Sequence, residues 1–175
     1  MNAPGVDESV DRIVILDFGS QTTHLLGRRI RERGVYAEIV PGDTPTADWL
    51  DDTVRGIILS GSPMSVHDEN APRPDPSVFT CGRPLLGICY GLQVTTAMHG
   101  GAVSRSQQRE YGPAPVHVRA DHPLLEGIAP EFLSWMSHGD ALERLSEGAD
   151  LVARSTHGVP AIISIDSLRF VGLQF

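Results

Sequence analysis

The chain has 175 residues, a length typical of one domain, and its 14 basic and 22 acidic side chains give a formal net charge of −8. All the basic residues are arginines, because the sequence contains no lysine. The missing lysine excludes Schiff-base catalysis, a pyridoxal-phosphate anchor and a phosphate loop of the lysine type. The negative charge argues against a nucleic-acid partner, which needs a basic face.

The first 11 residues have neither a basic start nor an apolar run, which predicts a disordered tail and no targeting segment. No apolar stretch reaches the roughly 20 residues that span a bilayer, so we expect no membrane partner. The two cysteines, Cys81 and Cys89, are too few for a disulfide framework and indicate a reducing, cytoplasmic location.

The first half of the chain alternates apolar runs with helix-like segments. Residues 12–17 form a β-branched run that stops at a glycine-containing turn, which predicts a buried strand. A helix is expected next, with Ser20 as its N-cap, Leu26 and Ile30 on one face, and Gly34 after its last turn. Further strands are predicted at 36–40, 56–60 and 84–89. This alternation predicts an α/β fold with an open, mostly parallel sheet and helices on both faces.

The second half contains short apolar runs joined by turns. They predict strands at 116–119, 132–135, 151–154, 161–165 and 169–175. We expect a few of these to be antiparallel and to lie at the sheet edge, so that residues 12–175 form one domain. The last run has the character of a core strand, whereas domains normally finish on exposed residues. The domain is therefore expected to be incomplete at its C-terminus.

The sharpest local motif is Gly87-Ile-Cys-Tyr-Gly91, which lies between an apolar strand and the helix-like segment 92–98. It is the nucleophile-elbow pattern with cysteine in place of serine. A sharp turn would strain the backbone of Cys89, and glycines on both sides would prevent collisions. The helix N-terminus would favour the thiolate, and the Tyr90 amide could face an oxyanion. The alternative is that Cys89 is a small buried apolar residue.

Other residues could complete such a site. The N–H of Gly61, after the strand at 56–60, could turn toward the same oxyanion, although an ordinary strand exit has the same sequence. Among the seven histidines, His138 is the most suggestive, because a turn at Gly139 could direct polar groups into a cleft. Its setting favours a positional role over general-base catalysis. Cys81 has no elbow around it and is interpreted as structural.

Seven motifs, in this order along the chain, resemble the class I, triad-type glutamine amidotransferases. Asp17-Phe-Gly-Ser-Gln21 and Met136-Ser-His-Gly-Asp140 are most similar to the N-terminal glutaminase domains of GMP synthetases. The resemblance covers about residues 12–175. The motifs lie at residues 15–21, 34–38, 60–66, 71–75, 87–93, 109–112 and 135–140.

The resemblance implies that Cys89 attacks the carboxamide of L-glutamine and releases ammonia, and that water then frees glutamate. The implied site residues are Gly61 and Tyr90 for the oxyanion hole, Gln93, Ser137, Gly139 and Asp140 for glutamine binding, and Glu110 and Tyr111 for the face toward a synthetase domain. That ATP-pyrophosphatase domain, in the same chain or in a separate subunit, would use ATP and magnesium to aminate XMP, as a ligase. No cofactor or metal is expected in the glutaminase domain, and the full enzyme is expected to be a homodimer.

The sequence also departs from the family pattern. The catalytic His and Glu of the family stand in a His-Pro-Glu motif directly after the strand that matches residues 172–175, and this sequence contains neither. We therefore expect little glutaminase turnover from the chain alone. Ser62 replaces a glycine of the family but keeps the Gly61 amide. Two other functions stay open: an amidotransferase subunit of another synthetase or a γ-glutamyl hydrolase, and a non-catalytic glutamine-binding or regulatory module.

Overall fold

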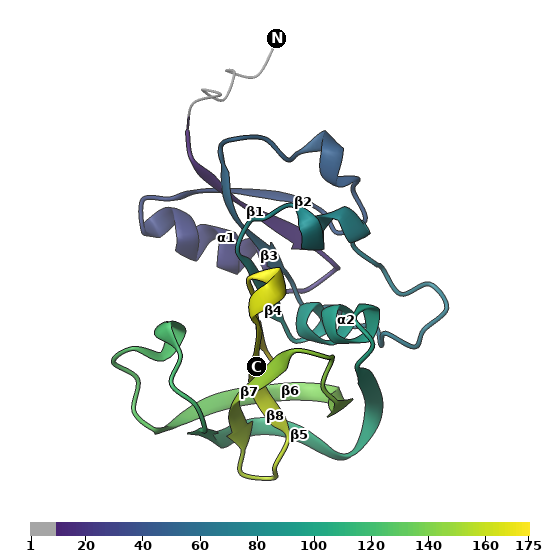
Figure 1. The fold of residues 1–175 in the computed structure, drawn as a ribbon, viewed down its shortest axis with the longest axis vertical. Helices are drawn as coiled ribbons and strands as arrows, with labels where there is room; N and C mark the ends of the chain where they lie inside the picture. Colours follow the sequence, from purple (N-terminus) through teal and green to yellow (C-terminus); the bar gives the residue numbers. More distant parts are fainter. Residues whose placement is uncertain (1–9) are drawn as a thin grey trace.

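A nine-stranded sheet forms the centre of the molecule in the computed structural model (Figure 1). The structure describes residues 10–175, without the side chains of residues 106–110 and of His138. The tail predicted over residues 1–11 therefore lies almost wholly outside the described residues. The strands are β1 (Arg12–Asp17), β2 (Tyr36–Pro41), β3 (Val54–Leu59), β4 (Leu85–Ile88), β5 (Ala102–Val118), β6 (Glu131–Arg144), β7 (Ala149–Ser155), β8 (Pro160–Ile165) and β9 (Phe170–Leu173).

The two α-helices of the described chain are α1 (Thr23–Glu32) and α2 (Tyr90–Met98). Neither helix is long and apolar enough to cross a membrane. Short 3-10 turns lie at Thr46–Asp48, Pro76–Thr80, Pro123–Leu125 and Asp166–Leu168.

The strand order is β2-β1-β3-β4-β9-β8-β7-β5-β6. The pairs from β2 to β9 are parallel, and the pairs from β9 to β6 are antiparallel. Figure 1 shows β5 to β8 gathered at one end of the molecule, away from α1 and β2. The predicted fold class is confirmed, and the antiparallel part is larger than a few edge strands.

Both faces of the parallel part are covered by helices, as predicted. On β1, Val14 and Leu16 belong to the same buried cluster as Leu92 of α2, whereas Ile15 belongs to a second cluster that packs against Leu26 and Ile30 of α1. Successive side chains of a strand point to opposite faces, so one strand contributes to both clusters. This arrangement leaves the carboxyl ends of β3, β4 and β9 at one shared edge of the sheet.

The first helix begins later than predicted. Thr22, not Ser20, is the N-cap of α1. The hydroxyl of Ser20 accepts a hydrogen bond from the Thr22 N–H at 3.2 Å, which closes a turn just before the helix. Such local bonds are the reason that serine favours both turns and caps, and the sequence pattern does not separate the two. Gly34 follows the helix with a φ of +79°, as expected for the residue that ends it.

Candidate active site

Cys89 lies at the tight turn between β4 and α2, as the elbow motif predicts. It is the N-cap of α2, with φ 47° and ψ −102°. A positive φ is strained for a residue with a side chain. The turn is held by two backbone bonds, from the Cys89 N–H to the Leu173 carbonyl at 2.7 Å and from the Gln93 N–H to the Cys89 carbonyl at 3.0 Å. The strained conformation of Cys89 is therefore fixed from both sides.

The glycines of the elbow are required by close packing. A Cβ atom on Gly91 would lie 2.2 Å from the carbonyl oxygen of Leu59. A Cβ atom on Gly87 would lie 2.8 Å from the carbonyl carbon of Gly91 and 2.7 Å from the ring of Phe170. The Gly91 N–H also donates to the Ser60 carbonyl at 3.0 Å. These contacts bring the first turn of α2 against the end of β3 and confirm the predicted reason for the glycines.

Gly61 is brought next to the nucleophile. A Cβ atom built on Gly61 would lie 3.8 Å from the Cβ of Cys89. Within the described part of the chain, the amides of Gly61 and Tyr90 donate to no protein acceptor. Two unpaired N–H groups close to a nucleophilic thiol are the components of an oxyanion hole. Their role in binding an oxyanion stays a prediction.

The thiol of Cys89 is held in its protonated form. Its sulfur donates to the backbone carbonyl of Gln174 at 3.2 Å. Burial raises the pKa of the Cys89 thiol from 9.0 to about 11. The loss of hydration penalises the charged form and so opposes the stabilisation of the thiolate that is expected from the helix N-terminus. Attack at neutral pH would need a proton acceptor.

Gln93 and Asp140 meet beside the elbow. Gln93 lies one helical turn after Cys89 and is 5% exposed. Its Nε2 donates to the backbone carbonyl of Asp140 at 3.1 Å, which joins α2 to β6. The carboxylate of Asp140 accepts a short hydrogen bond from the hydroxyl of Ser65. The structure thus brings two of the four predicted glutamine-binding residues close to the nucleophile.

The remaining predicted residues lie further along the β5–β6 pair. Ser137 is exposed and pairs with Tyr111. Gly139 lies inside β6, so the turn predicted there is wrong: its neighbours His138 and Asp140 pair with Glu110 and Arg105 of β5, and the register of the two strands shifts between these pairs. The side chains of Glu110 and His138 lie outside the described residues.

Cys81 is partly buried against the core, and its sulfur donates to the Val78 carbonyl at 3.0 Å. It lies at the end of the turn at Pro76–Thr80, away from the carboxyl end of β4. Its interpretation as a structural residue stays a prediction.

Two residues near the site were not predicted. Ser65 contacts Asp140, and Gln174 contacts both Cys89 and Gln93. Gln174 follows β9, the parallel neighbour of β4, and ligands of open α/β sheets bind at the carboxyl ends of such strands. That rule could have selected Gln174, but the sequence does not reveal the strand order needed to apply it.

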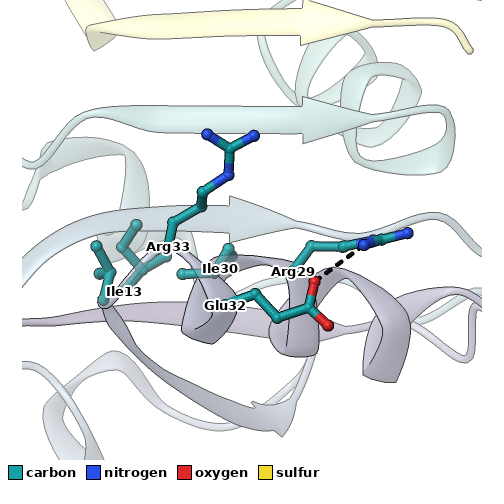
Figure 2. Close-up of a pocket in the computed structure, with 6 residues that line it drawn as sticks. Ile13, Arg29, Ile30, Glu32 and Arg33 are labelled. Carbon is teal, nitrogen blue, oxygen red and sulfur yellow. Dashed lines mark hydrogen bonds and ion pairs between the residues drawn. The ribbon is translucent and has the colours of Figure 1, made fainter.

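Two surface hollows lie away from Cys89. Figure 2 shows the first, of about 500 Å³, against the last turn of α1, where Arg29 and Glu32 form an ion pair at 2.9 Å. It is lined by Ile13 at the start of β1, so it lies at the amino ends of the parallel strands. The second, of about 930 Å³, is formed by the loop between β5 and β6. Cys89, Gly61 and Gln93 line neither hollow, so we assign the site from the backbone geometry of the elbow.

An open α/β sheet with a cysteine at a nucleophile elbow is the arrangement of enzymes that transfer acyl groups through a thioester. The family model for glutamine amidotransferase class-I matches residues 14–175. The chain therefore belongs to the class-I glutamine amidotransferase family.

Curated relatives carry a more specific description. The glutamine-hydrolysing GMP synthase of Nitrosococcus oceani is 48% identical in an alignment 172 residues long that covers 94% of this chain and 33% of the relative. That of Thermomicrobium roseum is 46% identical over 167 residues, which are 95% of this chain and 31% of the relative. The chain thus spans about a third of the length of these relatives.

Solved structures agree on the fold. A protein from Thermoplasma acidophilum, described as one subunit of a candidate GMP synthase, superposes with a TM-score of 0.79 at 26% identity and covers 95% of this chain and 83% of its own. A glutamine amidotransferase from Thermotoga maritima superposes with a TM-score of 0.73 at 21% identity and covers 94% of this chain and 75% of its own.

Proposed function

We propose that this chain is the glutaminase part of a glutamine-hydrolysing GMP synthetase. The observation that carries the proposal is Cys89, held at positive φ on the elbow with the unpaired amides of Gly61 and Tyr90 beside it. The names of the relatives support the choice of synthetase, because sequences so named match nearly the whole chain.

The proposed reaction begins with attack of the Cys89 thiolate on the carboxamide carbon of L-glutamine. A C–S bond forms, and the Gly61 and Tyr90 amides stabilise the negative oxygen. The C–N bond then breaks, ammonia leaves with an added proton, and water hydrolyses the thioester to glutamate and the free thiol. Gln93, Ser137, Gly139 and Asp140 hold the α-amino and α-carboxylate groups.

Proton transfer sets a requirement on this reaction. Within residues 10–175, the partner of the thiol is the Gln174 carbonyl, which cannot carry a proton away. Turnover therefore needs a base at Cys89 in addition to this described contact.

The ammonia would be used for the ATP-dependent amination of XMP to GMP. We place that step, with its ATP and magnesium, on a synthetase part in the same polypeptide or in a separate subunit. The two unpaired cysteines suit a cytoplasmic enzyme. A homodimeric full enzyme stays a prediction.

An electrophilic glutamine analogue provides the test of the nucleophile. We expect a chloromethyl ketone analogue of L-glutamine to add once to the chain, on Cys89, because displacement of chloride by sulfur requires only the thiolate and a filled pocket. Mass spectrometry of the intact and digested protein measures the adduct. Cys89→Ser is expected to lose it, and Cys81→Ser, the matched control, to keep it.

The D-enantiomer of the same reagent separates recognition from simple reactivity. Equal rates for both enantiomers would contradict a glutamine pocket at Cys89 and would favour the interpretation of the chain as a non-catalytic module.

We further propose that an apolar face of the β5–β6 pair receives the synthetase part. Tyr111, Leu133 and Trp135 are 66%, 68% and 69% exposed. Pro113 pairs with Trp135, and Tyr111 pairs with Ser137, so these side chains share one face, while Ala114 and Met136 are buried on the other. Large exposed apolar groups gathered on one face are typical of protein interfaces.

This face lies on the same strand pair as part of the candidate site. Ser137 leads along β6 to Asp140, whose carbonyl contacts Gln93. A domain seated on the face would lie next to the candidate site on the same strand pair. The relatives carry about two thirds of their length outside the matched region, which is the material that we expect to cover it.

Trp135→Thr tests this interface in a polypeptide that carries both parts. We expect glutamine hydrolysis to continue while ammonia escapes into solvent, so that glutamate formation exceeds GMP formation. The measured quantity is the ratio of the two products. Leu25→Gln, which alters another exposed apolar side chain on α1, is the control and should leave the ratio unchanged. An unchanged ratio in Trp135→Thr would show that this face is not part of the interface.

A further inference from the structure

Gln174 is a buried residue whose backbone contacts the nucleophile. The residue is 0% exposed. Its N–H donates to the Ala161 carbonyl at 2.9 Å, and its carbonyl accepts the Cys89 thiol at 3.2 Å. Its backbone is therefore held between β8 and the elbow, and its side chain is buried.

That side chain contacts Gln93. The Nε2 of Gln93 donates to the Asp140 carbonyl, which can only accept, so the orientation of the Gln93 amide is settled. The same Nε2 lies 3.4 Å from the Oε1 of Gln174. Both N–H bonds of Gln93 are thus directed into the protein, which leaves its Oε1 as the atom free to accept a hydrogen bond from a ligand.

The side chain of Gln174 is only half satisfied by hydrogen bonds within the described chain. Its Nε2 is buried and has no hydrogen-bond partner within the described part of the chain. A buried amide without a partner destabilises the folded state, and an apolar side chain of the same shape would avoid this cost. The side-chain contact that the described chain gives Gln174 is the one to Gln93, so Gln93 is the residue through which Gln174 can act.

We propose that Gln174 is a positioning residue that fixes the Gln93 carboxamide for recognition of the amino-acid end of the substrate. The inference rests on the proposed glutaminase function and assigns a residue that acts through another one. Gln174 contributes to the binding of the substrate through its side chain, and its carbonyl separately orients the Cys89 thiol.

Gln174→Met is the central variant, because methionine has a similar length and no hydrogen-bonding amide. We expect the chloromethyl ketone analogue of glutamine to inactivate it with a half-saturation concentration roughly three- to tenfold higher, the equivalent of one lost hydrogen bond. Alkylation by iodoacetamide, which has no amino-acid group, should change by less than about twofold, since the backbone carbonyl remains. The melting temperature should stay the same or rise.

Val171→Ile is the matched control, since Val171 lies three residues before Gln174 on β9 and packs in the cluster on the other face of the sheet. It should leave all three measurements unchanged. Gln174→Asn keeps an amide but is one methylene too short to reach Gln93. It should therefore raise the half-saturation concentration of the analogue in the same way as Gln174→Met. The double variant Gln93→Met/Gln174→Met should match Gln93→Met alone, because Gln174 acts through Gln93.

A readout without any glutamine analogue keeps this inference distinct from the proposed function. In NMR spectra, the side-chain NH₂ protons of Gln93 should exchange faster with solvent in Gln174→Met than in the original chain. Unchanged exchange and an unchanged half-saturation concentration would overturn the positioning role. Failure of both Gln174 variants to fold would overturn it too, because it would show a structural role. A wild-type chain that shows no saturation with the analogue would instead overturn the glutaminase function.

Discussion

Gly91→Ala is expected to lower the free energy of unfolding by about 3 kcal/mol or more, at the upper end of the cost of overpacking. The added methyl group would lie 2.2 Å from the carbonyl oxygen of Leu59, a backbone atom that cannot rotate away. Relief requires α2 to move from β3, which would break the Gly91 to Ser60 hydrogen bond and displace Cys89. Chemical denaturation measures the change.

Gly56→Ala is the matched control. Gly56 lies on β3, the strand against which Gly91 packs, but a Cβ atom there would meet only the Pro84 carbonyl, at an ordinary 3.8 Å. We expect a change of less than about 1 kcal/mol for it, as for substitutions that create no overlap. A Gly91→Ala protein as stable as this control would show that α2 does not press on β3, and the geometry assigned to the elbow would be wrong.

The elbow could be predicted because its information is local. Five consecutive residues contain the nucleophile, both glycines and the change from strand to helix, and the structure places Cys89 at the strained turn that they indicate. The first strand was also predicted with its observed bounds, 12–17, since a buried parallel strand is an unbroken apolar run.

The long β5–β6 pair could not be predicted in full. Residues 102–115 contain polar residues, glycine and proline, and they are extended because β6 pairs with them over most of their length. Strand pairing of this kind depends on the partner more than on intrinsic preference. Gln174 and Ser65 could not be predicted for the same reason. Gln174 contacts Gln93, which is 81 residues away in the chain, and Ser65 contacts Asp140, which is 75 residues away.

The reactivity of Cys89 toward iodoacetamide is expected to depend steeply on pH. The thiolate is the reacting form, and burial raises the pKa of this thiol to about 11. The alkylation rate should therefore rise about tenfold per pH unit from neutrality and level off only near the raised pKa. In a Cys81→Ser variant, Cys89 is the one cysteine that iodoacetamide can alkylate. The rate at each pH, followed by mass spectrometry, gives the midpoint directly.

The unfolded chain supplies the comparison, because in denaturant the thiol should titrate near its ordinary pKa of 9.0. The folded state binds this proton more tightly, so the associated stability is fully present below pH 9.0 and is lost as the pH rises through about 11. A folded-state midpoint at or below 9.0 would show that the helix N-terminus outweighs burial. A midpoint near 11 would mean that the elbow supplies position but not activation, and that a base at the thiol has to contribute several orders of magnitude to attack at neutral pH.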